Sequence, residues 1–129
     1  EECFRTYAIE PLRMATACLE LIGRSNLKRV CFFSSAWASI NLSWTESDYG
    51  YCMALASMHE AISIMFNALH PLGFTFRLLC DAPGREGFVP AADAAGIVSY
   101  FLRDRFVDSH RDDEDRFVMR DRFGREYPW

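Results

Sequence analysis

The chain has 129 residues, of which 50% are hydrophobic and 25% are charged, and this predicts one globular domain spanning residues 1–129. Its net charge of −4 disfavours nucleic-acid binding, and no apolar run reaches the roughly 18–20 residues that a membrane span needs. The first residues lack a signal-peptide pattern, so we expect a cytoplasmic protein with no membrane partner.

The first half of the chain predicts a helix, a strand and a second helix. Pro11 suits the first turn of a helix, and apolar residues then recur at helical spacing up to a stop at Gly23. Residues 29–34 form an apolar run without alternation, which predicts a strand buried on both faces. A polar loop over 39–48 precedes a long helical pattern from 49 to about 70.

The second half predicts a strand, a helix and a short last strand. The strand covers 74–80 and is followed by a turn at 81–84, Asp-Ala-Pro-Gly. The helix runs from 91 to about 106, and a charged surface stretch at 108–116 separates it from the strand at 117–120.

This alternation of helices and strands predicts an α/β fold. Strands joined by helices of a dozen or more residues form parallel sheets through right-handed crossovers. We therefore expect three parallel strands with three helices, a partial Rossmann-like unit equal to half of a doubly wound sheet. Ligands of such sheets bind beyond the carboxyl ends of the strands, where Ser35 and the Pro83-Gly84 turn fall.

The five cysteines predict structural thiols in a reducing compartment. Their odd number and the lack of a CxxC pair disfavour a disulfide framework and a zinc site. Cys31 and Cys80 lie in apolar runs and are expected to be buried.

Several motifs in order resemble the C-terminal half of the short-chain dehydrogenases/reductases. The strand ends in Ser34-Ser35, a polar loop follows, and Tyr51 stands on the first turn of a long helix, as in the catalytic segment of that family. The resemblance implies Ser35 and Tyr51 as catalytic residues, with the tyrosine as general acid/base. It also implies NAD or NADP as cofactor, with Pro83 and Gly84 beside the nicotinamide.

Two positions depart from the family's catalytic set. The family has a lysine four residues after the tyrosine and an asparagine in the preceding helical segment, where this chain has Leu55 and Tyr7. A free tyrosine has a pKa of about 10, and a nearby cation favours its ionised form. Leu55 offers neither charge nor a hydrogen-bond donor. The Gly-rich turn that cradles the dinucleotide phosphates also has no counterpart here.

Alternatives remain at the predicted site. Ser39 competes with Ser35, because it lies nearer to the family's usual distance before the tyrosine. Tyr49 competes with Tyr51, but four residues after it stands Met53, which also lacks charge.

The histidines and the aromatic tail have plainer interpretations. His59 is interpreted as a residue of a helix face and His110 as part of a solvated charged loop, so no metal site is expected. The tail with Tyr127 and Trp129 is expected to pack on its own sheet or on a partner, not on nucleic acid.

Three functions are compatible with these patterns. The first is a truncated, degenerate relative of the dehydrogenases without independent oxidoreductase activity, acting through self-association or a partner. The strand at 29–34 would expose an edge, and homo-oligomers would form through helices near 10–23 and 50–70, as the family resemblance implies. The second is an NAD(P)-dependent oxidoreductase fragment that uses Tyr51 and Ser35 on an unknown small-molecule substrate, with the dinucleotide-binding half supplied elsewhere. The third is a small interaction module outside the family.

Overall fold

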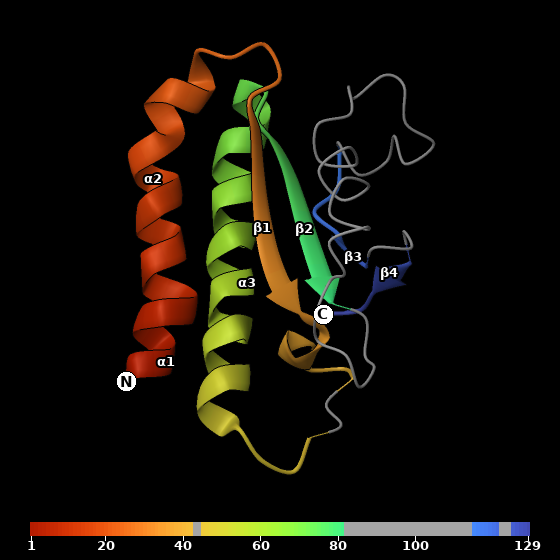
Figure 1. Ribbon diagram of the computed structural model, residues 1–129. Helices are drawn as coiled ribbons and strands as arrows, with labels where there is room; N and C mark the ends of the chain where they lie inside the picture. The colour runs from red at the N-terminus through yellow and green to blue at the C-terminus, as the bar shows by residue number, and fades with distance from the viewer. Residues whose placement is uncertain (43–44, 82–114, 122–124) are drawn as a thin grey trace, which may run out of the picture.

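The computed structural model describes residues 1–42, 45–81, 115–121 and 125–129. In chain order these contain α1 (Glu2–Phe4), a π-helical segment (Arg5–Ile9), α2 (Glu10–Gly23), β1 (Arg29–Ser35), a 3₁₀ turn (Ala36–Ala38), α3 (Tyr49–Leu69), a second 3₁₀ turn (His70–Leu72), β2 (Thr75–Asp81), β3 (Met119–Arg120) and β4 (Glu126–Tyr127). Figure 1 shows α2 and α3 side by side, with β1 and β2 running next to α3. The predicted turn at Pro83-Gly84 and the predicted helix at 91–106 lie outside the described residues.

The described strands form one sheet in the order β1-β2-β3-β4. β1 and β2 are parallel, with Arg29 opposite Thr75 and Ser35 opposite Asp81, and β3 is parallel to β2. This confirms the α/β prediction of three parallel strands, and among the described strands β1 lies at one end of the order. β4 was not predicted; it pairs antiparallel with β3, and a two-residue strand is too short to show a periodicity in the sequence.

The core lies between α3 and the sheet. Leu55, Met58 and Ile62, at helical spacing on α3, are buried against Phe32 of β1 and Leu78 of β2. This is the apolar stripe that the spacing of residues 49–70 predicts.

β1 is buried on one face only, so the prediction of a strand buried on both faces is wrong. Val30 and Phe32 are buried, whereas Cys31 is exposed and Phe33 is 65% exposed. The sequence could not show this, because β1 has apolar residues on both faces and the inside–outside alternation is hidden. The expectation that Cys31 is buried is wrong for the same reason, whereas Cys80 is buried, as predicted.

The first helical segment begins earlier than predicted and contains a π-type turn. Helical structure starts at Glu2, and the N–H of Glu10 donates to the carbonyl oxygen of Arg5, five residues back. Pro11 follows immediately and has no N–H to donate, so the regular ladder of helical hydrogen bonds is interrupted at this point. The predicted stops are confirmed: α2 ends at Gly23, and Gly73, with a φ of 86°, closes the turn after α3.

One described helical segment, Tyr49–Leu72, is long and apolar enough to cross a membrane by length and composition alone, although it contains no continuous apolar run of that length. These 24 residues, α3 and the following turn, are long enough for a span. Their mean hydropathy is also high enough, because Ala, Met and Ile offset the few polar side chains. A helix that packs on a sheet passes the same test, and α3 contributes Leu55, Met58 and Ile62 to the core. The segment is therefore weak grounds for a membrane span.

Candidate functional site

Ser35 is the last residue of β1, at the carboxyl end of the parallel strands. It is buried, and its Oγ accepts a hydrogen bond from the backbone N–H of Trp37 at 3.4 Å. Ser35 thereby caps the 3₁₀ turn that follows the strand. This hydrogen bond fixes the direction in which the chain leaves the sheet and places the Trp37 ring near the start of α3.

Tyr51 lies on the first turn of α3, where its backbone N–H donates to the carbonyl oxygen of Asp48. Its ring meets the Trp37 ring edge-on, with the ring centroids 6.2 Å apart. The structure therefore brings Ser35 and Tyr51 to the same end of β1. Trp37 contacts both, Ser35 through its backbone N–H and Tyr51 through its ring.

The structure shows the surroundings of Leu55 and Tyr7, the two residues that differ from the family's catalytic set. Leu55 is only 3% exposed and belongs to the hydrophobic core. The Tyr7 ring lies edge-on to the Tyr51 ring, with the centroids 5.0 Å apart. An aliphatic and an aromatic side chain thus occupy the positions at which the family resemblance implies a lysine and an asparagine.

The alternative residues have local structural roles. Ser39 is buried, and its Oγ accepts a hydrogen bond from the N–H of Leu42 at 3.2 Å, which stabilises a turn. Tyr49 and Met53 are exposed. Pro83 and Gly84 lie outside the described residues.

A contact between the half-buried Ser34 and the buried His59 links β1 to α3. His59 Nε2 lies 2.5 Å from Ser34 Oγ, and His59 is 5% exposed. Burial lowers the pKa of His59 to about 4, so the imidazole is neutral at pH 7. The interpretation of His59 as a plain helix-face residue missed this contact. A signal was present in the sequence, because His59 is four residues after Leu55 and three before Ile62, on the core side of the helix.

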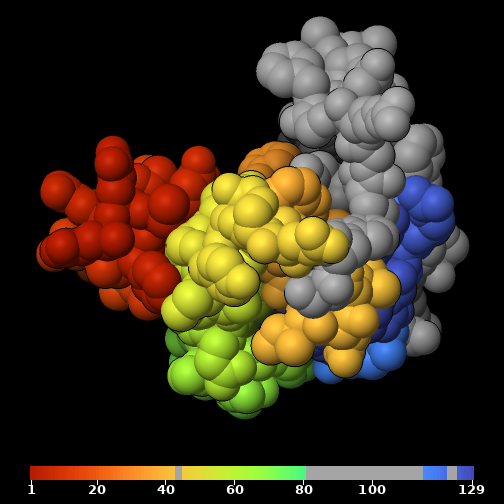
Figure 2. Space-filling view, turned by 90° about the horizontal axis from the view of Figure 1, so that it is seen from below, coloured from red at the N-terminus to blue at the C-terminus, as the bar shows by residue number. Residues whose placement is uncertain are grey.

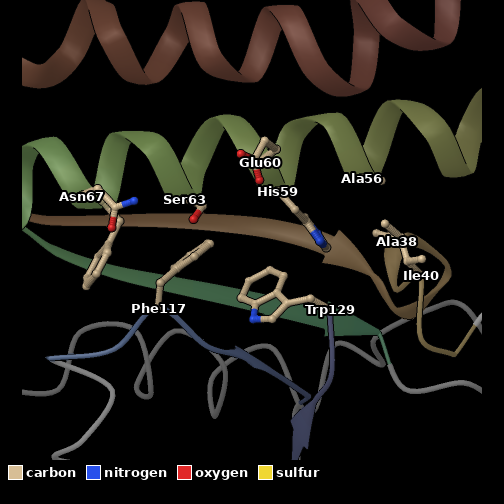
Figure 3. Close-up of a pocket in the computed structure, with 10 residues that line it drawn as sticks. Ala38, Ile40, Ala56, His59, Glu60, Ser63, Asn67, Phe117 and Trp129 are labelled. Carbon is tan, nitrogen blue, oxygen red and sulfur yellow. The ribbon is translucent and has the colours of Figure 1, made fainter.

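A cavity of about 470 Å³ opens between α3 and the C-terminal tail, beside His59. Its lining residues come from the turn after β1, from α3 and from the tail: Ala38, Ile40, Ala56, His59, Glu60, Ser63, Phe66, Asn67, Phe117 and Trp129 (Figure 3). Ser35 and Tyr51 are not among them.

The aromatic tail forms one wall of this cavity. The Trp129 ring stacks on Phe117 with the centroids 4.9 Å apart and meets His59 edge-on at 5.3 Å. The carbonyl oxygen of Trp129 accepts hydrogen bonds from the backbone N–H and the side-chain amide of Asn41. This confirms that the tail packs on its own fold.

A buried carboxylate, that of Asp121, links the end of β3 to Arg125 and to Tyr127 of β4. Asp121 Oδ1 accepts from the backbone N–H of Arg125 at 2.9 Å, and Oδ2 accepts from Arg125 Nε at 2.6 Å and from the Tyr127 hydroxyl at 3.3 Å. The hydrogen bond to Asp121 and the charge of Asp121 raise the pKa of Arg125.

No metal centre is found in the parts of the chain that the structure describes, since no three His, Cys, Asp or Glu side chains there are grouped to hold an ion. His110 lies outside these parts.

Comparison with known proteins identifies the fold. A carbonyl reductase from Pseudomonas aeruginosa PAO1 in complex with NADP is 27% identical, with a TM-score of 0.72 over 99% of this chain and 53% of its own. The carbonyl reductase Sniffer of Drosophila melanogaster is 17% identical, with a TM-score of 0.74 over 98% of this chain and 55% of its own. NADPH-bound carbonyl reductase from chicken fatty liver is 14% identical, with a TM-score of 0.73 over the same shares.

In sequence, the chain is similar to C-signal of Myxococcus xanthus, with 29% identity over 134 residues that cover 98% of this chain and 76% of that protein. No family model matches. The chain spans about half the length of the carbonyl reductases that it matches. Its fold is therefore the Rossmann-like α/β fold of carbonyl reductases, members of the short-chain dehydrogenase/reductase family.

Proposed function

We propose that this chain is a degenerate relative of the short-chain dehydrogenases/reductases, equivalent to their C-terminal half, that acts through self-association or a partner and has no independent oxidoreductase activity. The observation that supports this most strongly is Leu55, a buried core residue at the position of the family's lysine. No cation at this position is available to favour the ionised form of Tyr51.

The residues present do not fit a nicotinamide dinucleotide by themselves. Leu55 has no donor for a ribose hydroxyl. The Tyr7 ring beside Tyr51 has no amide to replace the one that the family resemblance implies. Two side chains of one mechanism are thus replaced together, while the helices and strands of the core remain.

Exposed apolar side chains on α2 and α3 support self-association. Met14 and Leu21 on α2 are 71% and 72% exposed, and Met53 and Ile64 on α3 are more than half exposed. Figure 2 shows the N-terminal helical segment, in red, standing out on one side of the molecule. An excess of large exposed apolar side chains is a common feature of protein–protein interfaces.

We expect the protein to form a dimer or higher oligomer through these helices, and the doubly substituted variant Met14→Glu/Leu21→Glu to weaken it at least tenfold. Two carboxylates would have to be desolvated in the interface. Sedimentation velocity over a range of concentrations measures the association. The control Leu72→Glu alters an equally exposed apolar residue beyond the end of α3 and should leave the association unchanged. A wild-type protein that remains monomeric at high concentration would contradict self-association.

The second candidate function is an NAD(P)-dependent oxidoreductase whose dinucleotide-binding half is supplied elsewhere. It is favoured by the position of Ser35 and Tyr51 at one end of β1 and by the similarity to a carbonyl reductase in complex with NADP. On our main proposal, NADPH titrated up to about 1 mM shows no change in its fluorescence. Saturable binding of NADPH in this range would favour the second candidate instead.

A further inference from the structure

The cavity beside His59 has a chemical character that the proposed function does not use. We propose that this cavity binds a small organic cation, a molecule with a planar aromatic body and an ammonium group. The two opposite walls, one aromatic and one polar, lead to this assignment. Figure 3 shows them facing each other, with α3 on one side and the rings of Phe117 and Trp129 on the other.

The aromatic wall consists of the rings of the tail and is extended by Phe66, which lies on α3 beside the polar wall. Phe66 stacks on Phe117 with the centroids 5.9 Å apart, and Phe117 stacks on Trp129 at 4.9 Å. All three residues line the cavity. Each ring is held by its neighbour, so little side-chain freedom is lost when a flat ligand packs against them. The faces of such rings also attract cations.

The polar wall consists of Glu60, Ser63 and Asn67, at helical spacing on one face of α3. Their carboxylate, hydroxyl and amide can all accept hydrogen bonds, which suits a ligand that carries several N–H donors. Glu60 forms no ion pair with any residue in the described ranges. A carboxylate that forms no ion pair within the described ranges, at the border of an aromatic surface, favours a cation over an anion.

Among the described residues that line the cavity, none carries a positive charge at pH 7. Besides Glu60, the ionisable side chain in this described part of the lining is His59, which is neutral at pH 7 because burial lowers its pKa to about 4. The volume of about 470 Å³ lies within the range of about 300–1,000 Å³ that is usual for small-molecule sites. The cavity therefore combines the size, the aromatic surface and the negative charge that an aromatic amine requires.

Calorimetric titration of the full chain with tryptamine and with indole-3-propionate tests the proposal. Both molecules contain an indole ring, but at pH 7 the first is a cation and the second an anion. We expect tryptamine to bind with a Kd of about 1 mM or below and the anion to bind at least tenfold more weakly. Equal affinity for the two compounds, or no binding of tryptamine up to about 10 mM, would overturn the proposal.

Two substitutions locate the binding. Glu60→Gln removes the charge and should weaken tryptamine about tenfold, while Glu20→Gln, at an exposed position on α2, should have no effect. Ser63→Leu should fill the cavity and abolish binding of tryptamine, whereas Ser57→Leu on an exposed part of α3 should not. Binding that survives both Glu60→Gln and Ser63→Leu would place the ligand elsewhere and contradict the proposal. Circular dichroism of each variant verifies that it is folded.

Discussion

Replacing Leu55 with lysine is expected to destabilise the protein by about 3–5 kcal/mol and not to produce oxidoreductase activity. Leu55 is 3% exposed and is surrounded by core residues such as Met58 and Ile62. A lysine here would have to bury a charge without a partner or lose its proton. The substitution that restores the family's motif therefore conflicts with the core of this chain.

Urea denaturation with far-UV circular dichroism measures this effect. Leu55→Met, which nearly conserves the volume, is the control and should cost less than about 1.5 kcal/mol. A buried lysine has a lowered pKa, so only the unfolded state binds the proton at neutral pH. The loss of stability should accordingly be smaller at pH 10 than at pH 7. If Leu55→Lys is as stable as the wild type and reduces carbonyl compounds with NADPH, both the core role of Leu55 and the proposed lack of activity are wrong.

The free energy of unfolding is expected to fall by about 3 kcal/mol between pH 7 and pH 4 because of His59 alone. Its pKa is lowered from 6.5 to about 4 by burial in the folded protein. The unfolded chain therefore takes up a proton as the pH falls through 6.5, while the folded protein keeps His59 neutral until about pH 4. Uptake by the unfolded state alone favours unfolding, so stability is lost as the pH falls through this window.

Comparison of variants separates His59 from the carboxylates, which also titrate in acid. His59→Phe loses the hydrogen bond with Ser34 but has nothing to titrate, so its free energy of unfolding should fall by about 3 kcal/mol less than that of the wild type over the same pH range. His70→Gln alters a histidine beyond the end of α3, keeps His59 and should retain the full loss. Equal acid sensitivity of the wild type and His59→Phe would show that His59 is not buried as a neutral group.

Local signals explain why the predicted elements agree so closely with the structure. α2 ends at the predicted Gly23, and α3 begins at the predicted Tyr49. Short apolar runs at 29–34 and 74–80 became β1 and β2 within one residue at each end. Glycine and proline stop helices through their own backbone geometry, so they act wherever they stand in a fold.

The candidate site was predictable only in part. The order of strand, serine pair, loop and tyrosine indicated that Ser35 and Tyr51 belong to one region, and the structure places both at the carboxyl end of β1. The contact between Ser34 and His59 joins residues 25 positions apart, and no spacing rule for a single helix or strand predicts it. Pro83 and Gly84 stay predictions, as do the cytoplasmic location, the oligomer and the lack of a membrane or nucleic-acid partner.

The amino-acid sequence by itself determined the α/β fold, the parallel order of the main strands and the departures Leu55 and Tyr7 from the family pattern, since these depend on local periodicity and residue identity. Only the tertiary structure decided which apolar residues are exposed, such as Phe33, and how Trp129 closes a cavity over His59. Burial and ring contacts depend on which segments, distant in the sequence, pack together. An apolar residue looks the same in the sequence whether its side chain packs against a helix or is exposed to solvent.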